Sequence, residues 1–217
     1  MSGYWSVEKG NHSHIQFKIK KNTNIGTHSK IQTLYFDDTR RFGKLEICYS
    51  KEQLEDKLKR VGIDLMNTAI QYFKFRQVNF AKKVQEEWLS YYLKIRKTGR
   101  SKNRTVFTLL MDQKYFSGIG CYIAAETLYK SKISPERKVV NLSKRDIINL
   151  FNNAITIMYL SYKSNGVTIR DYQDPEGGKG VFKRLVYGHN KDPNGYSVIK
   201  TKFNNGRTCQ WVKEIQV

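Results

Sequence analysis

One stretch of the sequence decides the fold that we expect: Gly118-Ile119-Gly120-Cys121-Tyr122-Ile123-Ala124-Ala125-Glu126, between two helix-forming segments. Glycines without side chains let the backbone N–H groups of a turn come close to an anion. The apolar run after the turn predicts a helix, and the positive end of its dipole would lie at the same place. A turn of this kind can also serve only to let a helix begin tightly. In a chain as basic as this one, we favour phosphate binding.

The charge of the chain points to a polyanionic partner. The sequence has 39 Lys and Arg residues against 19 Asp and Glu residues, which gives a formal net charge of +20 and a pI near 9.8. The excess is spread along the whole chain instead of being confined to a tail. Nucleic acid is the partner that we expect, and attraction to a membrane surface or simple solubility is the alternative.

Composition indicates a folded intracellular protein. Hydrophobic residues make up 39% of the 217 residues, which is enough for a core in one large or two small domains. The cysteines Cys48, Cys121 and Cys209 are too few for a four-cysteine zinc site and are odd in number, so we expect free thiols. No apolar run has membrane-spanning length and no signal-peptide core is present. We therefore expect a soluble intracellular protein that is not secreted.

The periodicity of the sequence divides the chain into three blocks. Residues 1–49 alternate polar and apolar positions, for example over 14–19 and 44–49, which predicts strands in hairpins. Residues 50–163 have helical periodicity, with capping signatures at Ser50 and Ser143 and one apolar face in the last helix, formed by Ile147, Phe151, Ala154 and Met158. Residues 164–217 return to strands and turns, and Asn204-Asn205-Gly206 predicts a hairpin between 198–203 and 207–212.

These motifs, in this order, resemble the formamidopyrimidine-DNA glycosylase / endonuclease VIII family of base-excision repair enzymes. The resemblance covers nearly the whole chain. It is carried by the following stretches: Met1-Ser2-Gly3, His12-Ser13-His14-Ile15, Asp38-Thr39-Arg40-Arg41-Phe42-Gly43, Leu110-Met111-Asp112-Gln113 through Ile133-Ser134-Pro135, Thr168-Ile169-Arg170-Asp171, Val186-Tyr187-Gly188 and Gly206-Arg207-Thr208. The family's helix-two-turn-helix motif corresponds to the fourth stretch, and its C-terminal finger corresponds to the last three.

The resemblance implies an α+β fold in three parts. These would be the C-terminal part of a β-sandwich domain (1–49), a helical domain with the helix-two-turn-helix (50–163), and a zincless β-hairpin finger (164–217). It also implies a DNA glycosylase and abasic-site lyase for oxidised bases. The partner would be double-stranded DNA with a damaged base or abasic site, bound by a complete protein that is a monomer, without a cofactor, metal or membrane. The protein would act in the nucleus or another DNA-containing compartment.

Site residues follow from the same resemblance. Gly118, Gly120, Cys121, Tyr122 and Arg207 would bind DNA, with Arg207 on the phosphate beside the extruded nucleotide. A second set of side chains would fill the gap that this nucleotide leaves in the duplex, where apolar, planar cationic and aromatic groups are suited to intercalation. The members of this void-filling set are Met1, Arg40 and Phe42.

The chain departs from the family pattern at three places. Only Cys209 and His189 lie near the family's zinc position, so no tetrahedral set is expected and the hairpin would replace the metal. Cys121 stands where the family usually has a phosphate-binding asparagine, so backbone amides would carry more of the binding. The family's N-terminal proline nucleophile, the glutamate after it and a lysine further on have no counterpart in this sequence, so we place no catalytic residue in this chain.

Several residues also have a purely structural interpretation. Arg207 could be an ordinary exposed arginine and Phe42 could belong to the core, while we expect a buried hydrogen-bonding role for Glu126. His12 and His14 share a strand face but lack a third metal ligand, so we favour a structural role. The basic run over 82–104 could be a solvated face or could add nonspecific phosphate contacts. A noncatalytic DNA- or RNA-binding protein with a helix-two-turn-helix remains the alternative function.

Overall fold

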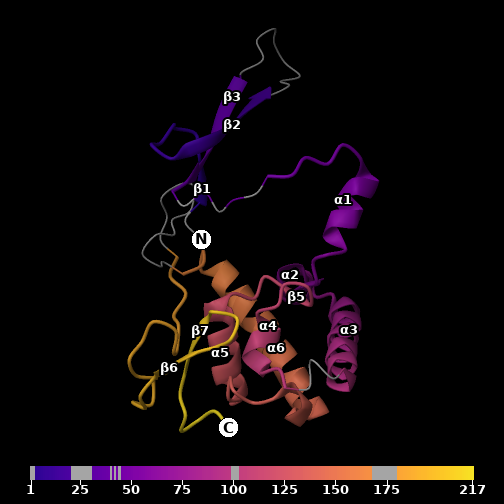
Figure 1. The fold of residues 1–217 in the computed structure, drawn as a ribbon, viewed down its shortest axis with the longest axis vertical. Coiled ribbons are helices and arrows are strands. Elements are labelled where there is room, and N and C mark those ends of the chain that lie inside the picture. The colour runs from indigo at the N-terminus through magenta and orange to yellow at the C-terminus, as the bar shows by residue number, and fades with distance from the viewer. Residues whose placement is uncertain are drawn as a thin grey trace. The chain divides into compact units, whose positions relative to one another are not determined.

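The structure is a computed structural model that describes residues 3–20, 31–39, 41, 43, 45–98, 103–167 and 180–217. Contacts divide the chain into two compact units (Figure 1). The first comprises Met1–Cys48 and Ser164–Phe182, and the second comprises Tyr49–Lys163 and Lys183–Val217. Helices and small sheets occur together in the chain, which confirms the predicted α+β class.

The first unit contains a three-stranded antiparallel sheet in the order β1-β3-β2. Its strands are β1 (Gly3–Ser6), β2 (Ser13–Lys20) and β3 (Ile31–Asp38), so the strand predicted over 14–19 is confirmed. The Trp5 ring contacts the rings of Phe36 and Phe17, with centroid distances of 4.9 and 5.6 Å. Where β2 begins, the buried Asp37 carboxylate of β3 accepts hydrogen bonds from the His12 N–H and the Ser13 hydroxyl.

The strand predicted over 44–49 is wrong for the described part of that segment. Residues 45–49 form neither a helix nor a strand. The apolar side chains of the alternating pattern are exposed, with exposed fractions of 52% for Leu45, 65% for Ile47 and 85% for Tyr49. Alternation indicates a strand only when one face is buried against something, and here that burial is missing.

The second unit is mostly helical. Its helices are α1 (Lys51–Leu58), α2 (Leu65–Phe73), α3 (Val78–Lys97), α4 (Val106–Leu110), α5 (Cys121–Ser131), the 3-10 helix η1 (Val139–Asn141) and α6 (Lys144–Lys163). Its strands are β4 (Ile63–Asp64) and β5 (Phe116–Ser117), which pair in parallel, and β6 (Ile199–Lys202) and β7 (Thr208–Trp211), which form an antiparallel hairpin. No helix in the described residues is long and apolar enough to cross a membrane.

Both predicted helix caps are confirmed. The Ser50 hydroxyl accepts a hydrogen bond from the Gln53 N–H, and the Gln53 side chain accepts one from the Tyr49 N–H. The Ser143 hydroxyl accepts a hydrogen bond from the Asp146 N–H, while the Asp146 carboxylate accepts the Ser143 N–H. These side chains satisfy backbone donors that the first turn of a helix leaves unpaired.

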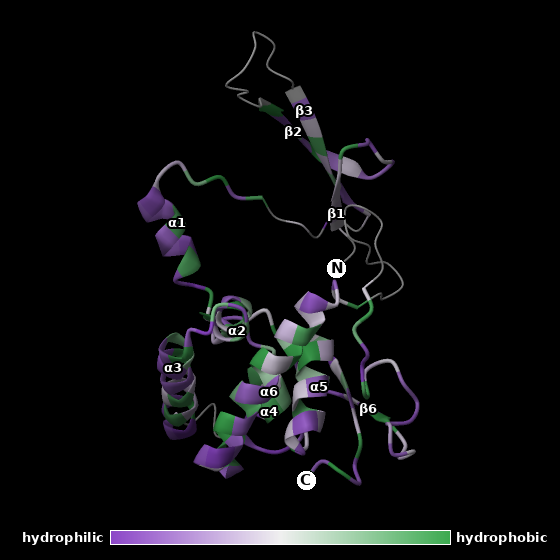
Figure 2. Cartoon of the chain, turned by 180° about the vertical axis from the view of Figure 1, so that it is seen from behind, coloured by the Kyte–Doolittle hydropathy of each residue, from purple (hydrophilic) through white to green (hydrophobic). Residues whose placement is uncertain are grey.

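The core of the second unit includes Trp88, where α3 packs against α6 and β5. This side chain is fully buried, its ring contacts Phe116 and Phe151, and its Nε1 donates a hydrogen bond to the Ile147 carbonyl at 3.1 Å. The predicted apolar face of the last helix is confirmed, because all four of its members are at most 2% exposed. In Figure 2, α3 carries both hydrophilic and hydrophobic segments, as an amphipathic helix on a core does.

Candidate nucleic-acid interface

The glycine turn leads directly into α5, as the sequence predicts. Gly118 has a φ of +87°, which a side chain would strain, and an added Cβ would also lie 2.8 Å from the Met158 Cε. Gly120 is the N-cap residue of α5, and no side chain caps this helix end. An added Cβ at Gly120 would meet nothing within 4 Å. The backbone at the start of α5 is therefore open to an approaching group.

Gln113 fixes the shape of this turn. Its side-chain oxygen accepts a hydrogen bond from the Gly118 N–H at 3.0 Å, and its side-chain nitrogen donates to the Ile119 carbonyl at 2.9 Å. The same nitrogen lies 3.2 Å from the Met111 carbonyl, so one amide side chain joins the end of α4 to the turn. A turn that is held in this way needs little rearrangement to bind an anion.

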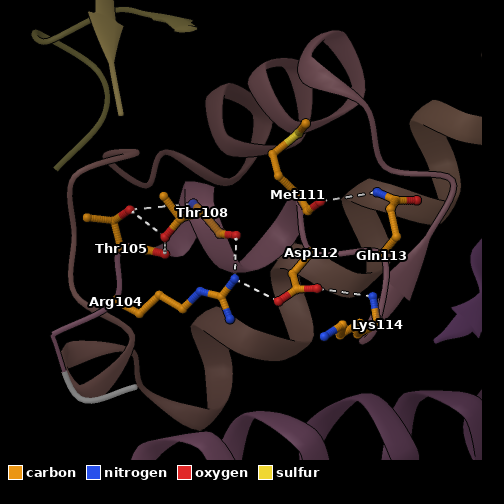
Figure 3. Close-up of polar contacts among 7 residues, drawn as sticks. All are labelled: Arg104, Thr105, Thr108, Met111, Asp112, Gln113 and Lys114. Atoms are coloured by element: carbon orange, nitrogen blue, oxygen red, sulfur yellow. Dashed lines mark hydrogen bonds and ion pairs between the residues drawn. The ribbon is translucent and has the colours of Figure 1, made fainter. Parts of the chain in front are cut away.

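An ion pair between Arg104 and Asp112 connects the two ends of α4, on the N-terminal side of the glycine turn (Figure 3). Arg104 Nη2 lies 2.8 Å from Asp112 Oδ2 and donates a second hydrogen bond to the Thr108 carbonyl at 3.1 Å. The other oxygen of Asp112 accepts the Lys114 N–H at 3.1 Å. Both charged side chains are about three-quarters buried, with exposed fractions of 27% and 23%. The residues on either side of Gln113 are therefore well fixed.

Cys121 and Tyr122 open α5 and lie beside residues 183–217 of the second unit, which we call the finger. The Tyr122 hydroxyl is 2.8 Å from the Ser161 hydroxyl on α6, and its ring centroid is 6.2 Å from that of Tyr187. Burial raises the pKa of Tyr187, and the neighbouring Cys121 raises it further. Cys121 is a partly buried free thiol, and a thiol is a weak hydrogen-bond donor. The backbone N–H groups of this turn are therefore stronger hydrogen-bond donors than the Cys121 thiol.

Glu126 joins α5 to the finger. Its carboxylate is 1% exposed and accepts three backbone N–H groups, from Leu185 at 2.8 Å, Val186 at 3.0 Å and Tyr187 at 2.9 Å. The predicted buried hydrogen-bonding role of Glu126 is therefore confirmed. One side chain of the helix that carries the turn thus holds the base of the finger.

A second buried carboxylate, Asp192, lies further along the finger. It accepts hydrogen bonds from the Tyr129 hydroxyl on α5 at 2.8 Å, from the Tyr196 N–H at 2.8 Å and from the Asn194 N–H at 3.0 Å. Burial disfavours its charged form, but these hydrogen bonds outweigh that effect and hold the pKa of Asp192 below its ordinary value. Burial and the Asp192 carboxylate together raise the pKa of Tyr129 to about 12.

The hairpin carries Arg207 next to its turn. The turn closes through hydrogen bonds from the Gly206 N–H to the Phe203 carbonyl and from the Phe203 N–H to the Arg207 carbonyl, and Gly206 has a φ of +74°. The Arg207 N–H donates to the Asn205 side chain at 3.1 Å. The Arg207 side chain is exposed, and within the described residues no hydrogen bond or ion pair engages its guanidinium group. The predicted hairpin is confirmed.

The predicted site residues divide into two groups. Gly118, Gly120, Cys121 and Tyr122 form one turn, and Arg207 lies on the hairpin whose strand β7 packs on α5. The void-filling residues Met1, Arg40 and Phe42 lie outside the described residues. In the finger, burial raises the pKa of the Cys209 thiol, and no group of three metal-ligating side chains occurs in the parts of the chain that the structure describes.

Three supporting residues were missed by the sequence reasoning: Gln113, Tyr129 and Asp192. Gln113 belongs to the stretch Leu110-Met111-Asp112-Gln113 that resembles the family, but its hydrogen bond to the Gly118 N–H depends on the three-dimensional shape of the turn. Asp192 begins an Asp-Pro-Asn-Gly stretch, which indicates a turn. Nothing in the sequence indicates that Tyr129 would reach it from 63 residues away.

Known proteins similar to this chain include the glycine turn and α5 in the part that they match. The family model described as "Formamidopyrimidine-DNA glycosylase H2TH domain" matches residues 86–173. A formamidopyrimidine-DNA glycosylase of Exiguobacterium sp. is 26% identical over 208 residues, which cover 94% of this chain and 66% of that protein. The one from Ureaplasma parvum is 31% identical over 183 residues, covering 81% and 58%. The chain thus spans less than two thirds of the length of these curated relatives.

Solved structures agree on the fold. The crystal structure of MutM (Fpg) from Thermus thermophilus covers all of this chain with a TM-score of 0.75 at 22% identity, and 73% of that chain is matched. The complex between Lactococcus lactis Fpg and an abasic-site-containing DNA gives a TM-score of 0.72 at 21% identity, with 72% of that chain matched.

We predict that Gln113→Ala loosens the glycine turn without unfolding the protein. The substitution removes the acceptor of the Gly118 N–H and the donor to Ile119, so the Gly118 amide should exchange its hydrogen at least tenfold faster. Amide hydrogen exchange read by NMR tests this. Gln113→Glu is the matched control, because it keeps the acceptor and should preserve most of the protection. Unchanged exchange in Gln113→Ala would show that the turn holds its shape without this side chain.

The raised pKa of Tyr129 gives a pH prediction with a definite sign. The folded protein keeps the Tyr129 proton between the ordinary pKa of 10.0 and about 12, so its stabilisation is complete below pH 10 and is lost as the pH rises through about 12. Tyr129→Phe should cost about 1–2 kcal/mol in urea unfolding at pH 8. The difference from the unsubstituted protein should shrink at pH 11.5. Tyr162→Phe, at an exposed position, is the control and should cost little at either pH.

Proposed function

We propose a function for this chain from one premise: it belongs to the formamidopyrimidine-DNA glycosylase / endonuclease VIII family. The proposed function is recognition of damaged DNA in base-excision repair, with double-stranded DNA that contains a damaged base or an abasic site as the partner. The observation that carries this proposal is the open, braced glycine turn at the start of α5, which is joined through Glu126 to the finger that bears Arg207.

The turn and the finger would bind the DNA backbone beside the lesion. The turn supplies backbone N–H groups and the positive end of a helix of 11 residues, which favours a phosphate. Arg207 supplies an exposed guanidinium group, which binds phosphate oxygens through paired hydrogen bonds. Extruding a nucleotide costs a few kcal/mol of unstacking, and contacts to the displaced phosphate offset part of that cost. A damaged or abasic position costs less to extrude, so these contacts favour it over intact DNA.

Three further residues would complete recognition. We propose that Met1, Arg40 and Phe42 fill the gap left by the extruded nucleotide, as the family resemblance implies. A planar cation and an aromatic ring can stack on neighbouring bases and offset the lost stacking. A duplex whose gap is filled stays bent for longer, which lengthens the contact of its phosphate with the turn.

The chemistry expected of the family is removal of the base followed by cleavage of the strand at the abasic site. In the family, an uncharged N-terminal proline amine attacks the sugar carbon and forms a Schiff base. The prolines of this sequence are Pro135, Pro175 and Pro193, and none of them lies at the N-terminus. We propose that these 217 residues supply recognition and that the nucleophile is not among them.

Arg207→Ala should weaken binding to an abasic-site duplex more than binding to the same duplex without the lesion. We expect about a tenfold loss for the lesion duplex, equivalent to about 1.4 kcal/mol, and less than a threefold loss for the intact one. Fluorescence anisotropy at a fixed salt concentration measures both. Arg207→Lys should recover part of the loss. Equal losses on the two duplexes would make Arg207 a general charge contact and would favour the noncatalytic nucleic-acid-binding alternative.

Borohydride trapping tests where the nucleophile lies. Borohydride reduces a Schiff base between an amine and the opened sugar to a stable covalent adduct. Because we place the nucleophilic amine outside this sequence, the 217-residue chain incubated with an abasic-site duplex and borohydride should give no adduct. A full-length formamidopyrimidine-DNA glycosylase serves as the positive control in the same reaction. An adduct on the 217-residue chain, located by mass spectrometry, would identify an amine of this sequence as the nucleophile and would overturn this part of the proposal.

A further inference from the structure

A polar groove lies between the hairpin and the segment that leads into α4. It has a volume of about 920 Å³ and is lined by the stretch around Arg104, by Glu136 and Lys138 after α5, and by residues 201–205 of the hairpin. Three of the lining side chains are cationic, namely Arg104, Lys138 and Lys202, and Glu136 is the one acid among them. Six others carry a hydroxyl or an amide group, and Phe203 is the one apolar member.

The cations of this groove differ in how far they are already used. Arg104 is held by Asp112 and the Thr108 carbonyl. Lys138 donates one hydrogen bond, from Nζ to the Asn103 carbonyl at 2.8 Å, and an ammonium group has two further donors. Lys202 is exposed, and no ion pair or hydrogen bond of its ammonium group occurs within the described residues. Lys138 and Lys202 therefore have donors available for a ligand.

We propose that this groove binds the sugar-phosphate backbone of the bound DNA at a phosphate other than the one beside the lesion. The inference rests on the proposed function and extends it to a second contact. Lys, Arg, Thr and Asn side chains are the groups that contact DNA phosphate and sugar without reading sequence. The groove is open and carries separated cations, which is suited to a continuous chain of phosphates, whereas its single apolar member gives a protein partner little surface to bury.

Continuity with Arg207 supports this occupant. Asn204 and Asn205 line the groove, and the Asn205 side chain accepts the Arg207 N–H at 3.1 Å. The same hairpin turn therefore carries the proposed lesion contact and one wall of the groove. Lys202 pairs with Thr208, the residue after Arg207, so this lysine and this arginine lie near the same turn of the hairpin.

The experiment compares two double variants of equal charge. Lys138→Ala/Lys202→Ala removes the two groove lysines that have donors available, and Lys83→Ala/Lys97→Ala removes two exposed lysines of the basic run on α3, so the second variant measures the effect of nonspecific charge. Each is titrated by anisotropy against two abasic-site duplexes, one with a long flank only 5′ of the lesion and one with a long flank only 3′ of it. Titrations over a range of salt concentrations give the slope of log K against log salt, and thermal unfolding confirms that both variants fold.

The groove variant should lose five- to tenfold in affinity for one of the two duplexes and little for the other. On the affected duplex, its salt slope should fall by about 0.9 for each phosphate contact that is lost. Losses equal to those of the α3 variant, or equal on both duplexes, would overturn the groove contact. If the groove contact is overturned but lesion preference still depends on Arg207, the proposed function stands. If the unsubstituted protein shows no lesion preference, both the groove contact and the proposed function are overturned.

Discussion

Within the second unit, the attachment of residues 185–187 to α5 depends on one buried carboxylate, Glu126. Burying a charged group costs several kcal/mol unless hydrogen bonds replace its water, and Glu126 accepts three backbone N–H groups in succession. Such charge-assisted bonds are about twice as strong as neutral ones. They also leave little freedom, because three consecutive amides must converge on two oxygens. The base of the finger is therefore placed against the same helix whose first residues form the glycine turn.

Asp192 repeats this device further along the finger. It converts a short loop into a closed structure by accepting the N–H groups of Asn194 and Tyr196, and the Tyr129 hydroxyl attaches that loop to α5. Glu126 and Tyr129 are three residues apart and so lie on the same side of one helix. Two attachments on one helix face restrict both the position and the rotation of the finger base. Hydrogen bonds to buried acids can thus organise a finger in the way that a tetrahedral metal site would.

Local patterns in the sequence predicted the elements that local physics controls. The glycine turn, the caps at Ser50 and Ser143 and the Asn-Asn-Gly hairpin each depend on residues only a few positions apart. The amides that Glu126 binds are about 60 residues distant, and Tyr129 reaches Asp192 across 63 residues, so only the folded chain brings these groups together. The strand predicted over 45–49 is wrong because its alternating pattern is typical of a strand, but nothing in the described residues buries its apolar face. Residues that brace a site are thus harder to predict than residues that form it.

The thiol at Cys121 is compatible with the proposed anion site, in which backbone N–H groups would hold the anion. A thiol adds little hydrogen bonding to an anion, so binding strength must come from the orientation of N–H groups. Gln113 supplies that orientation from one side by holding Gly118 and Ile119, and Glu126 fixes the helix from the other side by holding the finger. Oriented amides need no reorganisation when an anion arrives, which makes them more effective than a mobile side chain. The space beside Gly120 is open, so an anion bound as we propose would meet no neighbouring side chain there.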